Sequence, residues 1–253
     1  MTKKEKLERL LDGAVGKAIF EYDLIGPNDH VLVALSGGKD SWALLFTLAR
    51  LKKKAPVHYD LTAIHVSVNS PAENVKQMSD YLDNHGFAYE ILTTNIYNLT
   101  RQKIPEGKNP CPFCARMRRG ALYGRGRKGD VTKIALGHHQ EDAMETLLLN
   151  LFYAGQIRGM APKFTAEDGI NTIIRPMIFT RERTILNYAE VMEFPVFNNC
   201  PFKEKKESKR AEMKRLIRDL ERQNRRVKKS IMNAMRNVDP VHLMDKRLYR
   251  EEQ

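Results

Sequence analysis

The chain of 253 residues is long enough for one large α/β domain or for a catalytic domain with a modest extension. With 42% hydrophobic and 29% charged residues, its composition excludes collagen-like, low-complexity and wholly disordered proteins. No stretch approaches the roughly 20 apolar residues of a membrane span, and the N-terminal residues contain no apolar signal-peptide core, so we expect a cytoplasmic protein without a membrane partner.

Strand and helix patterns alternate along the first 200 residues or so. An amphipathic helix over 4–20 comes first and is expected to pack on the main domain. Strands are predicted over 30–35, 61–68, 87–93, 131–136 and 172–174, and helices over 42–51, 73–85, 141–153 and 182–192. Because such alternation builds βαβ units, it predicts an α/β fold with a doubly wound, mostly parallel sheet. Residues 154–169 are expected to form a loop, and the chain beyond Cys200 a charged helical region.

The positive charge is concentrated in two segments. The formal net charge is +12; residues 101–128 contain nine basic side chains against one acidic, and residues 203–230 contain thirteen against five. Each segment therefore has a net charge of +8, which leaves the rest of the chain slightly acidic. A pair of well-solvated basic helices would give the same pattern, but the concentration favours a footprint on the phosphate backbone of a nucleic acid.

The first predicted strand leads directly into Ser36, Gly37, Gly38, Lys39, Asp40 and Ser41. Open α/β sheets bind ligands at the carboxyl ends of their strands, which is where this string lies. Its glycines let backbone amides approach an anion, its serines add hydroxyl donors, Lys39 adds charge, and the next helix directs its N-terminus at the site. The string is not a Walker A loop, because Val33 and Asp40 occupy positions where that motif needs Gly and Ser or Thr. A plain glycine turn would not need the whole string, so we predict a polyphosphate site with Asp40 as the ligand of Mg²⁺.

The three cysteines are Cys111, Cys114 and Cys200. An odd number without a secretory signal argues against a disulfide framework and for thiolate chemistry or metal ligation. Cys111 and Cys114 form a Cys-x-x-Cys pair in a predicted loop, away from the strand-to-helix start that a thioredoxin-like redox pair occupies. Zinc would have to recruit a histidine, whereas a [4Fe–4S] cluster with one open iron takes three thiolates. The residues alone leave zinc and the cluster as alternatives.

A second polar group follows the fourth predicted strand. Gly137, His138 and His139 come at its end, and Asp142 starts the next helix. Their structural interpretation is a hydrogen-bonded packing histidine and an acid favoured by the helix dipole. Because the carboxyl ends of parallel strands meet at one edge of a sheet, we expect this group beside the phosphate loop, where it would serve function.

The string at 36–41 resembles the Ser-Gly-Gly-x-Asp-Ser motif of the PP-loop ATP pyrophosphatase superfamily. The resemblance implies cleavage of ATP between its α and β phosphates, transfer of AMP to a substrate carbonyl oxygen and release of pyrophosphate. It also implies that adenine lies near Ala34 and His65, at the ends of the first two strands, and that Gly137 belongs to the nucleotide site. The imidazole of His65, like those of His30 and His85, is otherwise interpreted as structural.

Further motifs resemble the tRNA 2-thiocytidine biosynthesis (TtcA) family. They are the Cys-x-x-Cys pair with Arg-x-Arg-Arg-Gly at 116–120, Gly-His-His-Gln-Glu-Asp at 137–142, Gly-Met-Ala-Pro-Lys at 159–163 and Arg-Asn-Val-x-Pro-x-His-Leu-x-Asp at 236–245. The resemblance implies a [4Fe–4S] cluster on Cys111, Cys114 and Cys200, a catalytic acid or base at Asp142, and Arg118 as a stabiliser of negative charge. Two positions depart from that family. Glu141 replaces the usual Asp, and Cys200 lacks a second Cys-x-x-Cys-Gly, as in the archaeal and eukaryotic 2-thiouridine enzymes.

The resemblance implies an ATP-dependent tRNA sulfurtransferase that adenylates the C2 oxygen of an anticodon-loop cytidine, tRNA position 32, and replaces it with sulfur. Asp40 and Asp142 would handle the metal and protons, with ATP, Mg²⁺ and the cluster as cofactors. The expected partners are tRNA, a sulfur donor (a cysteine desulfurase or sulfide) and a second copy in a homodimer.

The expected organisation is a helix over 1–25, a PP-loop catalytic domain with the iron–sulfur site over 26–200, and a basic helical extension over 201–253. A 2-thiouridine-forming thiolase, a lysidine synthetase-like enzyme and an RNA-binding iron–sulfur sensor are the alternatives.

Overall fold

The computed structural model describes residues 1–197, 200, 202 and 208–249. The chain forms two compact units, Met1–Gln140 with Ala161–Lys206, and Glu141–Met160 with Glu207–Gln253. Within the described residues, no helix is long and apolar enough to cross a membrane. The three-part division expected from the sequence stays a prediction.

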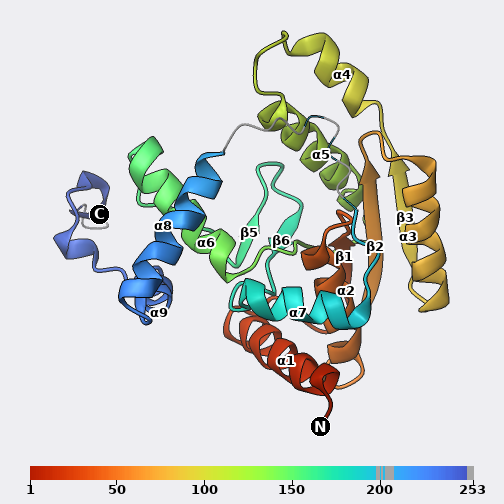
Figure 1. Cartoon of the computed structure of the whole chain (residues 1–253), viewed down its shortest axis with the longest axis horizontal. Coiled ribbons are helices and arrows are strands. Elements are labelled where there is room, and N and C mark those ends of the chain that lie inside the picture. Colours follow the sequence, from red (N-terminus) through yellow and green to blue (C-terminus); the bar gives the residue numbers. More distant parts are fainter. Residues whose placement is uncertain (198–199, 201, 203–207, 250–253) are drawn as a thin grey trace. The chain divides into compact units, whose positions relative to one another are not determined.

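The first unit is built around a six-stranded sheet in the order β3-β2-β1-β4-β6-β5 (Figure 1). The strands are β1 (Asp29–Ala34), β2 (Tyr59–Ser67), β3 (Tyr89–Thr93), β4 (Lys133–Ala135), β5 (Lys163–Thr165) and β6 (Thr172–Ile174). All neighbouring pairs in this sheet are parallel except β5 with β6. The predicted α/β fold with a mostly parallel sheet is therefore confirmed. Two details differ, because the fourth strand is shorter than 131–136 and the expected loop over 154–169 contains β5.

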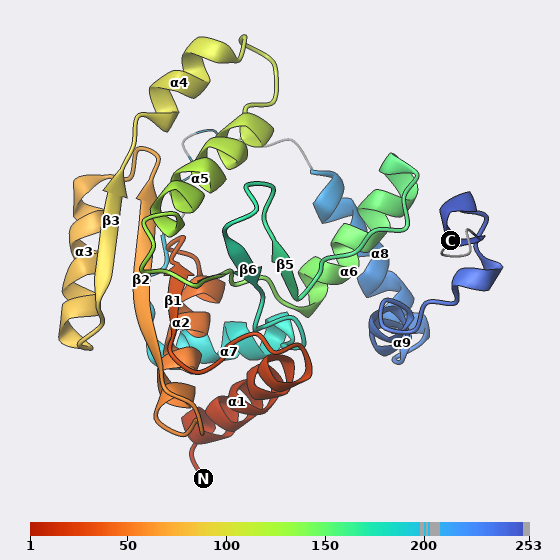
Figure 2. The same cartoon turned by 180° about the vertical axis from the view of Figure 1, so that it is seen from behind.

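Helices cover both faces of this sheet (Figure 2). They are α1 (Lys3–Glu21), α2 (Lys39–Lys52), α3 (Ala72–Asn84), α4 (Ile96–Lys103), α5 (Cys111–Gly126) and α7 (Glu182–Met192). Leu32 of β1 belongs to a core cluster with Cys114 and Leu122 of α5. Its neighbours Val31 and Val33 are equally buried and point to the opposite face, because side chains alternate along a strand. The sheet therefore has two apolar faces, as expected for strands covered on both sides.

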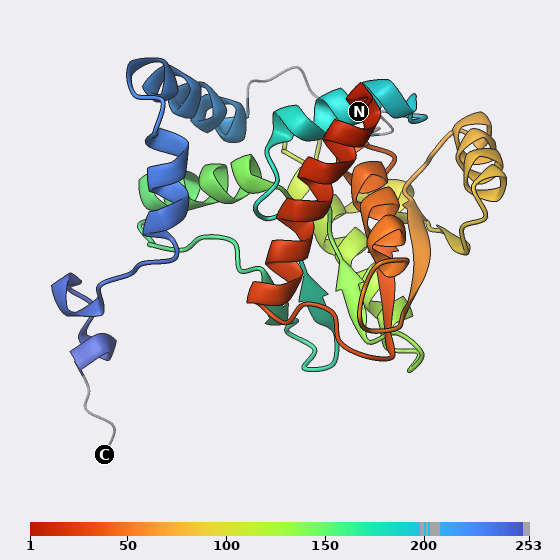
Figure 3. The ribbon, with the colours of Figure 1, turned by 90° about the horizontal axis from the view of Figure 1, so that it is seen from below.

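The face opposite α5 is covered by α1, α2, α3 and α7, and Figure 3 shows α1 lying along α2 and α7. Trp42 of α2 is fully buried and meets Tyr81 of α3 edge to face, with ring centroids 5.2 Å apart. The Arg50 guanidinium donates to Asp12 of α1 at 2.6 Å and to the Tyr188 hydroxyl of α7 at 2.9 Å. These contacts fix the helix that follows β1, and with it the loop between them.

The second unit consists of helices and helical turns in its described part. They are α6 (Gln140–Leu149), a π-helical turn (Asn150–Ala154), α8 (Lys209–Gln223), α9 (Val227–Ala234) and two 3-10 turns (Pro240–His242 and Lys246–Tyr249). Met213 and Ile217 form the buried stripe of α8. Ion pairs join α8 and α9 to α6, since Arg210 lies 2.9 Å from Asp142 and Lys228 lies 3.4 Å from Glu141.

Candidate active site

The turn between β1 and α2 is tight because two glycines allow it. β1 ends at Ala34 and α2 begins at Lys39, three residues earlier than the helix predicted from Trp42. Gly37 has a φ of +84°, a left-handed conformation that side chains other than glycine rarely adopt. Gly38 is the N-cap residue of α2 and has no side chain with which to cover the first amides of the helix. The N-terminus of α2 is thus oriented to meet an anion at this turn.

The Ser41 hydroxyl closes the turn on itself. It accepts a hydrogen bond from the backbone N–H of Ser36 at 3.1 Å and donates one to the carbonyl of Gly38 at 2.8 Å. Ser41 is buried, whereas Ser36 is exposed, with its hydroxyl 3.2 Å from that of Ser41. These hydrogen bonds join residues within 36–41, so the phosphate loop has its shape without a bound ligand.

The charged residues of the loop are paired with one another and with α7. Lys39 Nζ lies 2.8 Å from Asp40 Oδ1 and 3.5 Å from Glu182 Oε1. Burial lowers the pKa of Lys39, but hydrogen bonds and attraction to both carboxylates outweigh it, so the net pKa is raised above its usual value. His139 Nε2 lies 3.9 Å from the same oxygen of Asp40. A cationic lysine and a carboxylate thus lie side by side where a polyphosphate and its metal would bind.

The end of β4 lies against this loop, as its strand position predicts. A Cβ atom on Gly137 would come within 3.1 Å of the Asp40 carbonyl group and the Ser41 nitrogen. Glycine is needed here because any side chain would push the start of α2 away from β4. The next residue, His138, accepts a hydrogen bond at Nδ1 from Arg175 Nε, 3.2 Å away.

The Cys-x-x-Cys pair forms the first turn of α5, which corrects its expected place in a loop. Cys111 is the first residue of the helix and is exposed, and Cys114, one turn later, is buried. Pro112 does not interrupt α5, because proline is compatible with a first helical turn, where backbone N–H groups have no partner within the helix. The helix geometry places the two sulfurs on one face.

One cavity of about 240 Å³ connects the phosphate loop with the cysteines. It is lined by Ser36, Gly38, His65, Val66, Val68, Ser70, Cys114, Arg118, Phe197 and Cys200. Residues far apart in the sequence, namely the loop, the end of β2, the start of α5 and the segment after α7, thus surround one space within the first unit. The sequence predicted six of these lining residues as site residues: Ser36, Gly38, His65, Cys114, Arg118 and Cys200.

Cys114 lies within electrostatic range of the other two thiols and of Arg118. Burial raises the pKa of the Cys114 thiol, Arg118 opposes that rise, and Cys200 and Cys111 add to it. Among the described residues, no three His, Cys, Asp or Glu side chains converge on one point that a single metal ion could occupy. Arg118 lies one turn after Cys114, and its positive charge favours the thiolate form of Cys114.

His65 is held in one tautomer at the wall of this cavity. Its Nδ1 donates to the carbonyl of Leu35 at 2.9 Å, because a carbonyl accepts only, and its Nε2 accepts from the Ser70 hydroxyl at 3.1 Å. Burial lowers the pKa of His65, the Leu35 carbonyl raises it, and Arg118 lowers it further. The imidazole is thus kept neutral, consistent with a structural role next to the predicted adenine position at Ala34.

Phe197 is a site residue that sequence reasoning missed. Its N–H donates to the carbonyl of Gly37 at 3.0 Å, and its ring lies 3.0 Å from where a Cβ of Gly37 would be. The segment that carries Cys200 is therefore bonded to the phosphate loop. The only signal in the sequence is the short distance from Phe197 to the third cysteine; the intervening residues 198–199 lie outside the described ones.

Asp142 belongs to the second unit, in the first turn of α6. Its carboxylate accepts a hydrogen bond from Arg210 Nη1 at 2.9 Å. Glu141, the departure from the resembled family, is buried and forms an ion pair with Lys228. The longer side chain at 141 thus has a partner on α9, and the role of Asp142 in proton transfer stays a prediction.

The basic segment over 101–128 contains fewer available cations than its count suggests. Arg125 donates to both Glu90 and Asp130, and these hydrogen bonds raise its pKa above the usual value of arginine. Arg127 lies 3.4 Å from Asp168. In the described part of the chain, Lys108, Arg116 and Arg119 form no ion pair, so the expected nucleic-acid footprint depends on such residues rather than on Arg125.

Known proteins resemble this chain over nearly its whole length. The PP-loop domain family matches residues 17–216. The tRNA-cytidine(32) 2-sulfurtransferase of Geobacter metallireducens is 40% identical over 97% of this chain and 96% of that protein. A tRNA-cytidine(32) 2-sulfurtransferase of Burkholderia mallei is 42% identical over 96% of this chain and 74% of that protein. Among solved structures, the U34-tRNA thiolase NcsA of Methanococcus maripaludis, with its [4Fe–4S] cluster, has a TM-score of 0.74 at 22% identity and covers 98% of this chain and 81% of its own.

Proposed function

We propose that this chain, which belongs to the tRNA-cytidine(32) 2-sulfurtransferases within the PP-loop domain family, replaces the C2 oxygen of an anticodon-loop cytidine in tRNA with sulfur. One observation carries the proposal. The cavity that Ser36 and Gly38 of the phosphate loop line is the same cavity that Cys114 and Cys200 line. A site that activates an oxygen with ATP and a site that delivers sulfur must share one space, because both act on the same carbon.

The first step is activation of the base. ATP binds with its phosphates on the loop amides and the N-terminus of α2, and the C2 oxygen of cytidine attacks the α-phosphorus. Pyrophosphate leaves, and the former carbonyl oxygen is now bonded to AMP, a much better leaving group. Lys39 and the loop amides stabilise the charge on the phosphates, and we assign Asp40 to Mg²⁺. The Lys39–Asp40 pair, 2.8 Å apart, would then separate so that each binds its own partner.

In the second step, sulfur at the oxidation level of sulfide forms a bond to C2 while the C2–O bond breaks, and AMP leaves with the oxygen. The donor set would suit a [4Fe–4S] cluster with one iron free of protein thiolate, because Cys114 and Cys200 line one cavity and Cys111 lies one turn before Cys114 on α5. When bound, the cluster supplies an open iron position for the incoming sulfur. Arg118, which lines the same cavity, stabilises the negative charge that develops as the C2–O bond to AMP breaks. We assign proton transfer to Asp142, at the start of α6.

The tRNA is held by its backbone and read at an unpaired base. Exposed cations of the two basic segments, among them Lys108 and Arg116, bind phosphates and give the affinity a strong salt dependence. A base in a loop exposes its C2 edge, whereas a base inside a duplex does not. The sulfur donor, a cysteine desulfurase or sulfide, and a homodimer complete the proposal.

Mass spectrometry of tRNA nucleosides from the source cell, with and without this gene, tests the proposal. Selective loss of 2-thiocytidine on deletion, restored by the wild-type gene, is the expected result. Loss of a 2-thiouridine instead would keep the two-step chemistry and change the base. An unchanged set of thionucleosides would overturn the proposal.

A Cys111→Ala variant separates sulfur transfer from lysidine synthetase-like chemistry, which needs no thiolate. The variant is expected to leave tRNA unmodified, whereas full activity would favour attack by lysine. Formation of AMP and pyrophosphate from ATP and tRNA under anaerobic reducing conditions is the second expected result. Its absence would favour an RNA-binding sensor in which ATP changes only the conformation.

A further inference from the structure

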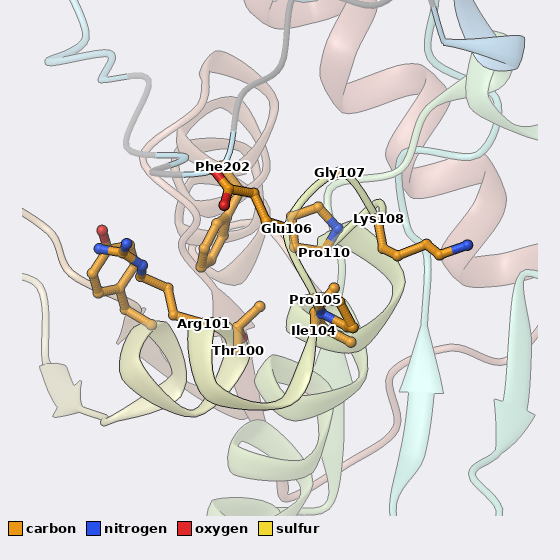
Figure 4. Close-up of a pocket in the computed structure, with 10 residues that line it drawn as sticks. Thr100, Arg101, Ile104, Pro105, Glu106, Gly107, Lys108, Pro110 and Phe202 are labelled. Atoms are coloured by element: carbon orange, nitrogen blue, oxygen red, sulfur yellow. The ribbon is translucent and has the colours of Figure 1, made fainter.

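A second cavity of about 560 Å³ lies in the first unit (Figure 4). Its wall comes from α4, from the connection between α4 and α5, and from Phe202. The phosphate loop does not line it, and neither step proposed above uses it. The cavity is larger than the one that holds the cysteines.

Aromatic rings and cations meet in this cavity. The rings of Tyr97 and Phe202 are stacked, with centroids 5.2 Å apart and planes 28° from parallel. The Arg101 guanidinium lies 5.9 Å from the centroid of Tyr97, and Figure 4 shows the ring of Phe202 directed toward Thr100 and Arg101. Lys108 and Glu106 are exposed parts of the same wall. A stacked aromatic pair with an adjacent guanidinium group is suited to a planar, negatively charged ligand.

The chain connects this cavity to the cysteines on two sides. Pro110 lines it and is followed directly by Cys111, so their Cα atoms are about 3.8 Å apart. Phe202 lines it two residues after Cys200, which limits the distance between those Cα atoms to about 7 Å. An RNA chain whose target base lies at Cys114 and Cys200 therefore has one neighbouring nucleotide on the side of Phe202 and the other on the opposite side.

We propose that this cavity binds the base of an RNA nucleotide adjacent to the target base, stacked on Phe202 and Tyr97 with its phosphate near Arg101 or Lys108. The proposal rests on the function proposed above and adds to it a site outside the reacting centre. Stacking is tolerant of base identity, and Glu106 can accept a hydrogen bond from an exocyclic amino group of the base. The site would hold the anticodon loop of the tRNA open while the target base reacts.

The test is binding of a fluorescent anticodon stem-loop RNA to the full-length protein, measured for intact RNA and for RNA with an abasic nucleotide on either side of the target cytidine. Phe202→Ala is expected to weaken binding of the intact RNA by about 5- to 150-fold, which corresponds to one stacked base. It is expected to leave unchanged the binding of the RNA that lacks the stacked base. Phe202→Tyr is expected to restore binding.

Phe202→Leu is the matched control, because it keeps an apolar side chain in the wall and removes the aromatic face. A pure packing role for Phe202 predicts wild-type binding by this variant, and that result would overturn the proposal. Arg101→Gln, at an exposed position, is the second variant and should weaken intact RNA and reduce the salt dependence of binding. Equal losses for intact and both abasic RNAs in Phe202→Ala would also overturn it.

The failure of this proposal and of the proposed function are distinguishable. If deletion of the gene removes 2-thiocytidine but Phe202 shows no coupling to a neighbouring base, the stacking site alone is wrong. If the wild-type protein does not bind the anticodon stem-loop at all, the proposed function fails with it.

Discussion

The phosphate loop occupies consecutive residues from Ser36 to Ser41, whereas the thiols that share its cavity come from α5 and from the segment after α7. The loop is ordered by bonds between its own residues, with the Ser41 hydroxyl bonded to Ser36 and Gly38. The cysteines are brought together by the fold, and the charges of the other two thiols raise the pKa of Cys114. The phosphate loop is therefore encoded by consecutive residues, while the arrangement of the cysteines depends on long-range packing.

This difference implies that the two steps can be separated by mutation. A change in the cysteines should remove sulfur transfer and leave the loop able to bind ATP. A change in the loop should weaken ATP binding and leave the thiols in place. The bond from the Phe197 N–H to the Gly37 carbonyl, 3.0 Å long, is the contact through which the two sides would still communicate.

The largest effect is expected from Cys114→Ala. It removes the buried thiol, so 2-thiocytidine in tRNA should fall to the level of the gene deletion, because the other cysteine of α5, Cys111, is exposed and does not line the cavity. ATP binding, measured by calorimetry, should stay within about twofold of the wild type, since the phosphate loop forms its own hydrogen bonds. Ser70→Ala, which changes the same cavity without touching a thiol, is the control and should retain thiolation. Normal thiolation by Cys114→Ala would contradict the cysteine assignment.

Ser41→Ala is expected to weaken ATP binding by about 5- to 150-fold. The substitution leaves the Ser36 N–H without its partner, which costs about 1–3 kcal/mol, and every 1.4 kcal/mol is tenfold in affinity. The Gly38 carbonyl loses the Ser41 hydroxyl but still accepts from the backbone N–H of Trp42. Ser36→Ala is the matched control, because its hydroxyl accepts from the Gly38 N–H over a longer 3.3 Å and is exposed. Calorimetry of both variants with ATP should show a larger loss of ATP affinity in Ser41→Ala than in Ser36→Ala. A larger loss in Ser36→Ala would show that the loop is not organised by Ser41.

The sequence predicted the features that depend on neighbouring residues and missed those that depend on distant ones. The phosphate loop and the alternation of strands and helices were predictable, because their signals are local and periodic. The helical start at Cys111 was missed, because the pair was assigned to a loop although proline is compatible with a first helical turn. Arg125 of α5 was counted as a cation for nucleic acid because its partner Glu90 lies on β3, far away in the sequence, where no sequence pattern points to it. Phe197 was missed for the same reason.

Gly137→Ala is expected to destabilise the protein by about 1–3 kcal/mol, the usual cost of overpacking. The new Cβ would lie 3.1 Å from the Asp40 carbonyl group, so the start of α2 must shift and ATP affinity should fall with stability. Gly120→Ala is the control, because a Cβ there meets nothing within 4 Å and the residue is exposed on α5. Alanine inside a helix should stabilise the protein by about 0.5–1 kcal/mol. The midpoint of thermal unfolding should fall in Gly137→Ala and rise in Gly120→Ala. Equal shifts in the two variants would contradict the close approach of β4 to the loop.

The smallest effect concerns His65, which joins the two sides by bonding the Leu35 carbonyl before the loop and lining the cysteine cavity. Burial lowers its pKa below the usual 6.5, so the folded protein keeps the imidazole neutral while the unfolded chain binds a proton as the pH falls below that value. The unfolded state then binds more protons than the folded state, and stability should fall as the pH decreases from 6.5 toward the lowered pKa. His65→Asn, which retains a donor for Leu35, should lose this part of the pH dependence. Unfolding curves in denaturant between neutral and mildly acidic pH measure the difference, and parallel pH profiles for the two proteins would mean that His65 is protonated equally in both states.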